Sequence, residues 1–213
     1  MNRRVRPPYW ARARRALAAS DPTLAAIIAQ HPRVALASRG DAFTTLARSI
    51  VGQQISVKAA DAVWGRFCNA CGELTPTQVL RRRAATLRAC GLSERKVEYI
   101  HDLCEHFVTG RVDPVRFAGE DDEAIIAELT DIRGIGRWTA EMFLIFNLLR
   151  PNVLPLDDLG LLRAVSLHYL DGEPVVGREG RARVESLALA WEPWRSVATW
   201  YLWRSLDPVP VEY

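Results

Sequence analysis

The 213-residue sequence contains very few signals for β-strands. It has no sustained alternation of apolar and polar residues, and no Asn-Gly or Asp-Gly pair is flanked by such alternation. Apolar residues instead recur at helical spacing, and short polar residues precede many of these stretches. We therefore expect an all-α chain in which short loops join the helices.

Long apolar runs are also missing. The most apolar stretch, residues 140–149, is interrupted by Glu141 and Asn147, and a membrane span needs a run of about 18 apolar residues. The basic first 20 residues contain no continuous apolar segment of the kind found in signal peptides. We expect a cytoplasmic protein that has no membrane contact.

Lysine is scarce, although the chain is mildly basic. The 28 basic residues include only Lys58 and Lys96, so 26 are arginines, and the formal net charge is +3. Arginine favours bidentate contacts with phosphate, but a GC-rich genome also encodes arginine by default. The composition alone therefore does not establish a nucleic-acid partner.

Cysteine occurs four times without a disulfide or metal framework. Cys68 and Cys71 form a C-x2-C pair, but Cys90 and Cys104 are poorly spaced to complete a zinc or iron–sulfur site. We expect four ordinary buried or half-buried thiols. A metal or redox protein built on the C-x2-C pair is the most remote alternative.

Capping residues predict where the helices begin. Candidate N-caps precede helical stretches at Asp41, Ser56, Thr75, Ser93, the pair Asp121 and Asp122, and either Asp157 or Asp158. A buried helix is predicted from Trp138 to Leu149, and the last two helices are expected at about 178–190 and 194–205. His101 and His106 are expected on the surface of the helix that begins after Ser93.

The segment Ile132-Arg133-Gly134-Ile135-Gly136 separates two predicted helices. Two glycines around one apolar residue favour a tight hairpin in which Ile135 fills the gap between the helices. The glycines also let a phosphate approach the backbone closely, and the start of the next helix favours an anion. This arrangement is typical of motifs that bind the DNA phosphate backbone independently of the base sequence, although a bare Gly-x-Gly is a weak signal.

Three further segments accompany this hairpin. The four motifs together are LARSIVGQQIS (Leu46–Ser56), GIGRWTA (Gly134–Ala140), PLDDL (Pro155–Leu159) and WEPWRS (Trp191–Ser196), the last followed by Trp200 and Trp203. Over residues 40–205 the chain resembles the helix-hairpin-helix DNA glycosylases, and within them most closely the DNA-3-methyladenine glycosylase II type.

The resemblance implies a two-lobed helical fold with a DNA-binding cleft between the lobes. It predicts N-terminal helices (1–42) that pack with the C-terminal lobe, a central lobe with the hairpin (43–157), and a C-terminal lobe that carries the catalytic aspartate (158–213). This last segment begins at the residue expected to act in catalysis.

Asp158 is the catalytic residue that the resemblance implies. Cleavage of a base–sugar bond builds positive charge on the deoxyribose, and a carboxylate can stabilise it and orient or deprotonate water. Asp158 is preferred to Asp157 because the family's aspartate lies five residues before a basic or polar helix position, here Arg163. Without the resemblance, both aspartates would be interpreted as helix caps.

Trp138, Met142 and Trp203 match positions of the family's base pocket. An alkylated purine such as 3-methyladenine or 7-methylguanine is cationic and gains about 1–2 kcal/mol over a desolvated indole face. Each tryptophan could instead belong to the core, and Met142 stands where relatives often have Tyr. Relatives that also cut the strand carry Lys at the position of Trp138, so the resemblance implies no lyase step.

The remaining expected site residues contact DNA or a cation. The expected DNA contacts are Gly134, Ile135, Gly136, Arg137, Thr139, Gln53, Gln54, Ser56 and Lys58. Gln54 is at the family's wedge position, although Gln53 and Gln54 could also cap a helix end. A structural monovalent cation is an option at the carbonyls of Thr130, Ile132 and Ile135, and no cofactor is required.

The sequence thus predicts a monofunctional glycosylase that flips alkylated bases out of duplex DNA and hydrolyses their N-glycosidic bond. We expect it to act as a monomer. Two alternatives remain: a glycosylase for deaminated or etheno purines, and a non-catalytic helix-hairpin-helix module that only binds DNA. A mere binder would need neither Asp158 nor the tryptophans.

Overall fold

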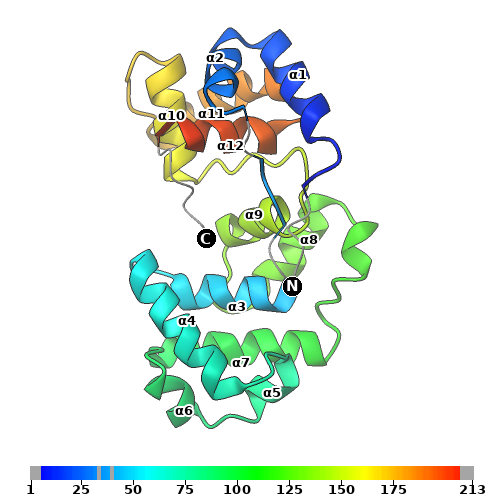
Figure 1. Cartoon of the computed structure of the whole chain (residues 1–213), viewed down its shortest axis with the longest axis vertical. Helices are drawn as coiled ribbons and strands as arrows, with labels where there is room; N and C mark the ends of the chain where they lie inside the picture. The colour runs from blue at the N-terminus through cyan, green and yellow to red at the C-terminus, as the bar shows by residue number, and fades with distance from the viewer. Residues whose placement is uncertain (1–5, 33–34, 39–40, 207–213) are drawn as a thin grey trace. The chain divides into compact units, whose positions relative to one another are not determined.

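The computed structural model describes residues 6–32, 35–38 and 41–206, and every regular element within them is a helix (Figure 1). The prediction of an all-α chain is confirmed. Among the described helices, none is long and apolar enough to cross a membrane. The other positions of the expected terminal segments, 1–5, 33–34, 39–40 and 207–213, lie outside the described residues.

The chain divides into two units. Unit 1 combines residues 1–39 with residues 144–212, and unit 2 is formed by residues 40–143. Unit 1 is therefore discontinuous in sequence. The boundary expected at residue 157 falls within unit 1.

Unit 1 is built around its last helix. Its elements are α1 (Trp10–Ser20), α2 (Pro22–Gln30), α10 (Leu159–Tyr169), α11 (Gly177–Leu187), the 3-10 turn η2 (Ala188–Trp191) and α12 (Arg195–Leu206). The helix α12 packs against α1, α2 and α10 (Figure 1). Trp10 contacts the rings of Trp200 and Tyr201 at centroid distances of 5.1 and 5.7 Å, and such pairs contribute about 0.5–1.5 kcal/mol beyond their burial.

Asp21 joins three separate parts of unit 1. Its side chain caps α2 by accepting the Leu24 N–H at 2.9 Å. The same carboxylate accepts the Tyr169 hydroxyl at 2.7 Å and the Trp191 indole N–H at 3.0 Å. Burial, and secondarily the Asp21 carboxylate, raise the pKa of Tyr169, so the phenol stays a donor.

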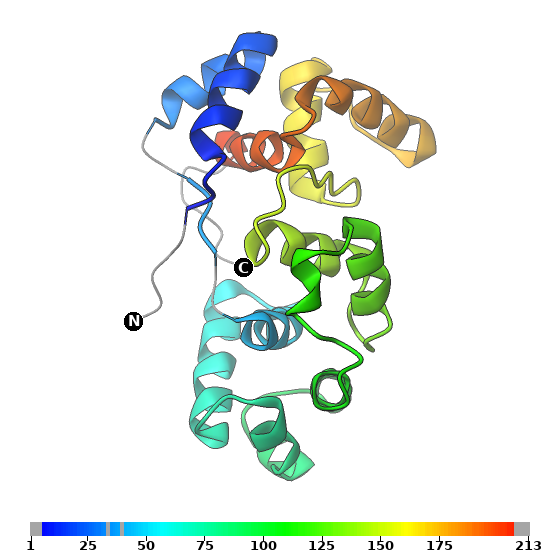
Figure 2. The same ribbon diagram turned by 90° about the vertical axis from the view of Figure 1, so that its right-hand side faces the viewer.

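Unit 2 is organised by α7, whose axis Figure 2 views nearly end-on. The elements that follow one another through this unit are α3 (Ala42–Gly52), α4 (Val57–Cys71), α5 (Pro76–Leu80), α6 (Ala84–Ala89), α7 (Glu94–Val108), the 3-10 turn η1 (Arg116–Ala118), α8 (Asp122–Thr130) and α9 (Arg137–Phe146). The helix α7 packs against α3, α5 and α6. The division between the units falls inside α9.

The predicted N-caps are largely observed as side-chain bonds. Asp41, Ser56, Thr75, Ser93 and Asp121 each accept the N–H of the residue three positions later. Each such bond contributes about 1 kcal/mol. Of the two candidates before α10, Asp158 is the cap.

The four cysteines are free, as expected. Cys71, Cys90 and Cys104 are buried and Cys68 is half-buried. Burial raises the pKa of Cys71 to about 11 and that of Cys104 to about 12. These two groups therefore remain neutral thiols near pH 7.

Two expectations differ from the structure. His106 is buried at 2% exposure rather than lying on the surface, because its two ring nitrogens find polar partners in Asp102 of the same helix and in Asp131 after α8. The helix predicted to reach Leu149 ends at Phe146. The chain turns there with Leu149 in the left-handed region (φ +56°), and the Arg150 N–H donates to the Leu144 carbonyl at 2.9 Å.

Candidate active site and DNA-binding hairpin

Asp158 lies at the first turn of α10 and is 6% exposed. Its Oδ1 accepts the Leu161 N–H at 2.7 Å, which caps the helix. The same oxygen accepts the indole N–H of Trp203 at 2.7 Å. Two donors from separate helices thus fix the orientation of one buried carboxylate within unit 1.

Trp203 approaches Asp158 closely because the intervening surface has no side chain. Its ring stacks on Phe146 with centroids 5.7 Å apart and an interplanar angle of 12°. A Cβ added at Gly160 would lie 3.1 Å from both Asp158 Oδ1 and Trp203 Cδ1. Gly160 therefore leaves the space in which the indole reaches the carboxylate.

The neighbouring carboxylate is in a different environment. The side chain of Asp157 is 58% exposed and forms an ion pair with Arg181 at 3.0 Å. The two adjacent aspartates are thus distinguished by burial and by their partners. Of these two adjacent aspartates, Asp158 is the one that combines burial with an aromatic donor.

The hairpin between α8 and α9 occupies residues 131–136 in unit 2. Gly134 has φ +86°, and a Cβ there would lie 2.2 Å from Cδ2 of Tyr99. Gly136 is exposed, and a Cβ there would meet no atom within 4 Å. Packing therefore requires the first glycine, whereas the second leaves the backbone open to an approaching ligand.

Ile135 is 4% exposed, as a residue that fills the gap between two helices must be. Thr139, one turn into α9, is also buried, at 6% exposure. The side chains of both residues face the protein interior. Any contact that they make with DNA would therefore come from their backbone atoms.

Arg137 is held by two carboxylates. Its guanidinium forms two hydrogen bonds with Glu123, at 2.9 and 2.5 Å, and its Nε donates to Glu141 Oε1 at 3.0 Å. The bond from Arg137 lowers the pKa of Glu123. The arginine side chain thus ties α9 to α8, and this contact was not apparent from the sequence.

The loop between α3 and α4 presents the predicted wedge residues. Gln53 Nε2 donates to the Gly134 carbonyl at 2.8 Å, which links this loop to the hairpin. Gln54 is exposed and has φ +57°. Ser56 caps α4 through the Ala59 N–H at 3.3 Å, and Lys58 is exposed on its first turn.

The predicted pocket residues are distributed over both units. Trp138 is half-buried and Met142 is 6% exposed in unit 2, whereas Trp203 is half-buried in unit 1. Within unit 1 the structure brings Trp203 together with Asp158. A pocket shared by the three residues stays a prediction.

Sequence reasoning missed Lys96 and Asp102, which contact the loops of unit 2. Lys96 Nζ donates to the carbonyls of Val51 and Gln53, both at 2.8 Å. Asp102 Oδ2 accepts the Arg133 N–H at 2.7 Å. The sequence showed that Lys96 and Asp102 lie on one predicted helix. It did not show their partners, which lie 31 to 45 residues away in the chain.

The backbone carbonyl oxygens of Thr130, Ile132 and Ile135 are the ligands predicted for a monovalent cation. The Ile132 carbonyl already accepts the Ile135 N–H at 3.1 Å, and a carbonyl retains a second lone pair. The Thr130 hydroxyl donates to the Ile126 carbonyl at 2.8 Å. Among the described residues, no group of three or more His, Cys, Asp or Glu side chains could hold a metal ion.

An all-α chain with a Gly-x-Gly hairpin between helices, and with a buried aspartate at the start of a later helix, has the features of a helix-hairpin-helix DNA repair protein. The chain matches the family described as HhH-GPD superfamily base excision DNA repair protein over residues 47–188. It belongs to this family.

Individual relatives agree with this assignment. The chain is 35% identical to DNA-3-methyladenine glycosylase 1 of Schizosaccharomyces pombe over 168 residues, which are 76% of this chain and 72% of that protein. The crystal structure of a Bacillus halodurans DNA-3-methyladenine glycosidase is similar with a TM-score of 0.76 and 38% identity, over 88% of this chain and 90% of that chain.

A second solved structure is the 3-methyladenine DNA glycosylase Mag1 of S. pombe in complex with abasic DNA. Its TM-score is 0.76 at 30% identity, and the match covers 95% of this chain and 98% of that chain. The fold is therefore shared with a glycosylase that has been observed on DNA.

Proposed function

We propose that this protein is a monofunctional DNA glycosylase that excises alkylated bases, of the 3-methyladenine and 7-methylguanine type, from duplex DNA. Membership of a base excision repair family and the names of its relatives support the proposal. The observation that carries it is the buried Asp158 carboxylate with the Trp203 indole bound to it. A protein that only binds DNA needs no such group.

Asp158 acts on the sugar in this proposal. The bond between C1′ and the base nitrogen breaks, and its electron pair leaves with the base. A cationic alkylated base leaves as a neutral molecule, so no strong general acid is needed. The carboxylate stabilises the positive charge on the sugar and directs the water that attacks C1′, and it accepts a proton from that water.

The hairpin holds the DNA backbone in this proposal. The first amides of α9 follow Gly136 directly, and helix starts attract phosphate oxygens. Because Arg137 is paired with Glu123 and Glu141, we assign the phosphate contact to the backbone rather than to this guanidinium. Lys58, exposed on α4, is a further candidate contact.

Base flipping leaves a gap in the duplex, and Gln54 is proposed to fill it. Its side chain is exposed on the loop after α3, and its backbone is in the left-handed region. An amide can hydrogen-bond the base left without its partner. The neighbouring Ile55, 41% exposed, would add apolar contact.

The finer assignments belong to the same proposal. Trp138, Met142 and Trp203 would contact the alkylated base, and Trp138 occupies the position at which bifunctional relatives carry Lys. We assign the protein to the glycosylase II type, acting as a cytoplasmic monomer. No catalytic step involves the cation that the carbonyls of Thr130, Ile132 and Ile135 could hold.

The test measures the bases released from methylated duplex DNA by wild type, Asp158→Asn and Asp157→Asn. Asparagine retains an oxygen that can accept the Leu161 N–H, so α10 keeps its cap. We expect wild type to release 3-methyladenine and 7-methylguanine. We expect Asp158→Asn to be slower by about 100-fold or more and Asp157→Asn to retain activity, because its side chain is exposed.

Three results would contradict the proposal in different ways. Equal activity of both variants would refute the catalytic assignment. Release of deaminated or etheno purines without methylated bases would change the substrate class. Binding of duplex DNA without release of any base would favour the non-catalytic module.

A further inference from the structure

One face of α7 carries polar side chains to both loops that the proposed function places on DNA. Lys96, Tyr99, Asp102 and His106 are spaced by three, three and four residues, which aligns them along one face of a helix. Each of these four residues contacts either the loop after α3 or the hairpin. We call these four residues the α7 support.

Lys96 fixes the end of α3. Its ammonium donates to the carbonyls of Val51 and Gln53 at 2.8 Å each, which suits a cation at a helix C-terminus. Burial lowers the pKa of Lys96. Gln53 in turn donates to the Gly134 carbonyl at 2.8 Å, so the two loops are bound to each other as well as to α7.

Asp102 binds the hairpin backbone itself. Its Oδ2 accepts the Arg133 N–H at 2.7 Å, and the neighbouring Glu98 pairs with the Arg133 guanidinium at 3.0 Å. Tyr99 covers Gly134, the next residue along the hairpin. Two consecutive hairpin residues are therefore held from α7, Arg133 through its amide by a carboxylate and Gly134 through packing against a ring.

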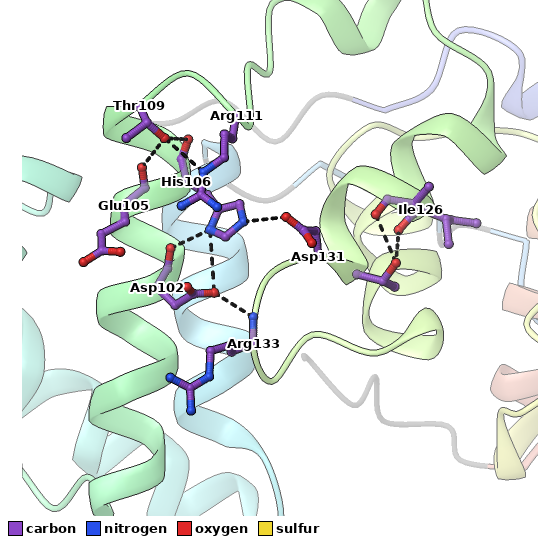
Figure 3. A network of polar contacts seen from close by, with 10 residues as sticks. Asp102, Glu105, His106, Thr109, Arg111, Ile126, Asp131 and Arg133 are labelled. Atoms are coloured by element: carbon purple, nitrogen blue, oxygen red, sulfur yellow. Dashed lines mark hydrogen bonds and ion pairs between the residues drawn. The ribbon is translucent and has the colours of Figure 1, made fainter.

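His106 holds the other end of the hairpin. Its Nε2 lies 3.1 Å from Asp131 Oδ2, and its Nδ1 lies 2.8 Å from the Asp102 carbonyl and 3.6 Å from the Asp102 carboxylate. Figure 3 shows the imidazole between Asp102 and Asp131, and the Asp102 carboxylate directed at the backbone nitrogen of Arg133. The ring is 2% exposed, which limits its movement.

We propose that Asp102, supported by His106, is a positioning residue that orients the hairpin backbone for phosphate binding. The inference rests on the proposed function, in which the hairpin grips DNA. Arg133 is exposed, so water could satisfy its amide and the bond is not needed to avoid a buried unpaired donor. Its effect is to hold the amides that follow in one arrangement before DNA arrives, which lowers the entropy cost of binding.

The test compares Asp102→Ala and Asp102→Asn with the control Asp113→Ala. Asp113 Oδ1 also accepts a backbone N–H, that of Val115 at 3.0 Å, but it lies outside the hairpin. Three quantities are measured for each variant. They are the Tm, the Kd for a duplex with an abasic-site analogue, and the single-turnover rate of base release at saturating enzyme.

We expect Asp102→Ala to weaken the Kd by about three- to tenfold, the equivalent of one oriented hydrogen bond. Its saturated rate should stay within about twofold of wild type, because no group that acts on the sugar has changed. Asp102→Asn should recover part of the affinity, since its amide oxygen can still accept the Arg133 N–H. The control should leave both Kd and rate unchanged.

An unchanged Kd in Asp102→Ala would overturn the inference, as would an equal loss in Asp113→Ala. A lowered saturated rate at unchanged Kd would also refute it, since the residue would then affect chemistry rather than binding. If wild type binds the duplex but releases no base, the proposed function fails while the binding comparison still decides the inference. If wild type binds no duplex, both fail.

Discussion

At the scale of single residues, Asp158 is both a helix cap and the proposed catalytic carboxylate. An aspartate that caps a helix is common, and its bond to the Leu161 N–H explains only the local fold. The bond from Trp203, 45 residues away, is additional. This second donor fixes the orientation of the carboxylate, and a group that must face a sugar needs a fixed orientation.

Trp203→Phe should separate orientation from packing. Phenylalanine can keep the stacking on Phe146 but loses the indole N–H, so we expect single-turnover base release to slow by about tenfold. Trp191→Phe is a matched control, since it removes an indole bond to Asp21 instead. It should lower the Tm and spare the rate. If both variants slowed base release equally, the Trp203 bond would have no special role.

The prediction that His106 lies on the surface was wrong. His106 lies three residues after Leu103 on the buried face of α7, but a polar ring at such a position is usually assigned to the surface. Its acceptor Asp131 is 25 residues away and on a different element. Helical periodicity shows which face a residue occupies, but it does not show which distant partner makes burial of that residue favourable.

At the scale of elements, the hairpin glycines have separable roles. Gly134→Ala forces an alanine into φ +86° and against Tyr99, so it should destabilise unit 2 by roughly 2 kcal/mol or more. Gly136→Ala meets no atom within 4 Å and should leave the Tm unchanged. Its methyl group would hinder a phosphate at the backbone, and we expect the Kd for duplex DNA to weaken by about tenfold.

Thermal unfolding and DNA titration of both glycine variants check this prediction. A Gly136→Ala protein with wild-type affinity would show that phosphate does not approach the hairpin there. A Gly134→Ala protein with wild-type Tm would show that Tyr99 can move away without cost.

The helices themselves were largely predictable because their signals are local. An N-cap and the amide that it accepts are three residues apart, so Ser56, Thr75 and Ser93 mark helix starts in the sequence alone. For α8 and α10 the sequence offered two adjacent aspartates each, and the structure shows that Asp121 and Asp158 are the caps. The contacts that arrange the site are not local. Glu123 and Arg137 are 14 residues apart and Gln53 and Gly134 are 81 apart, and pairings over such distances are set by tertiary packing.

At the scale of the whole molecule, the arginine content contributes less free charge than it suggests. Several arginine side chains form ion pairs with nearby carboxylates. These arginines include Arg48, Arg116, Arg133, Arg137, Arg181 and Arg183. This agrees with the modest net charge of +3. In the proposed complex, backbone amides of the hairpin therefore contribute more to phosphate binding, and arginine side chains less, than the arginine content implies.

The proposed monofunctional reaction predicts the state of the DNA strand in the product. Because Trp138 stands where a Schiff-base lysine would be needed, the DNA strand should stay intact at the abasic site until alkali is added. Sodium borohydride added during the reaction should trap no protein–DNA adduct. A trapped adduct that disappears in Lys58→Ala or Lys96→Ala would identify a lyase and refute the monofunctional assignment.

The discontinuity of unit 1 has a consequence for synthesis on the ribosome. The buried faces of α1 and α2 require α12, which is translated almost at the end of the chain. At about 5–20 residues per second, Trp10 waits roughly 10 to 40 seconds for its aromatic partners Trp200 and Tyr201. The contiguous unit 2 emerges during that interval and can fold first. The newly made chain therefore has a folded hairpin before α12 supplies the Trp203 indole that binds Asp158.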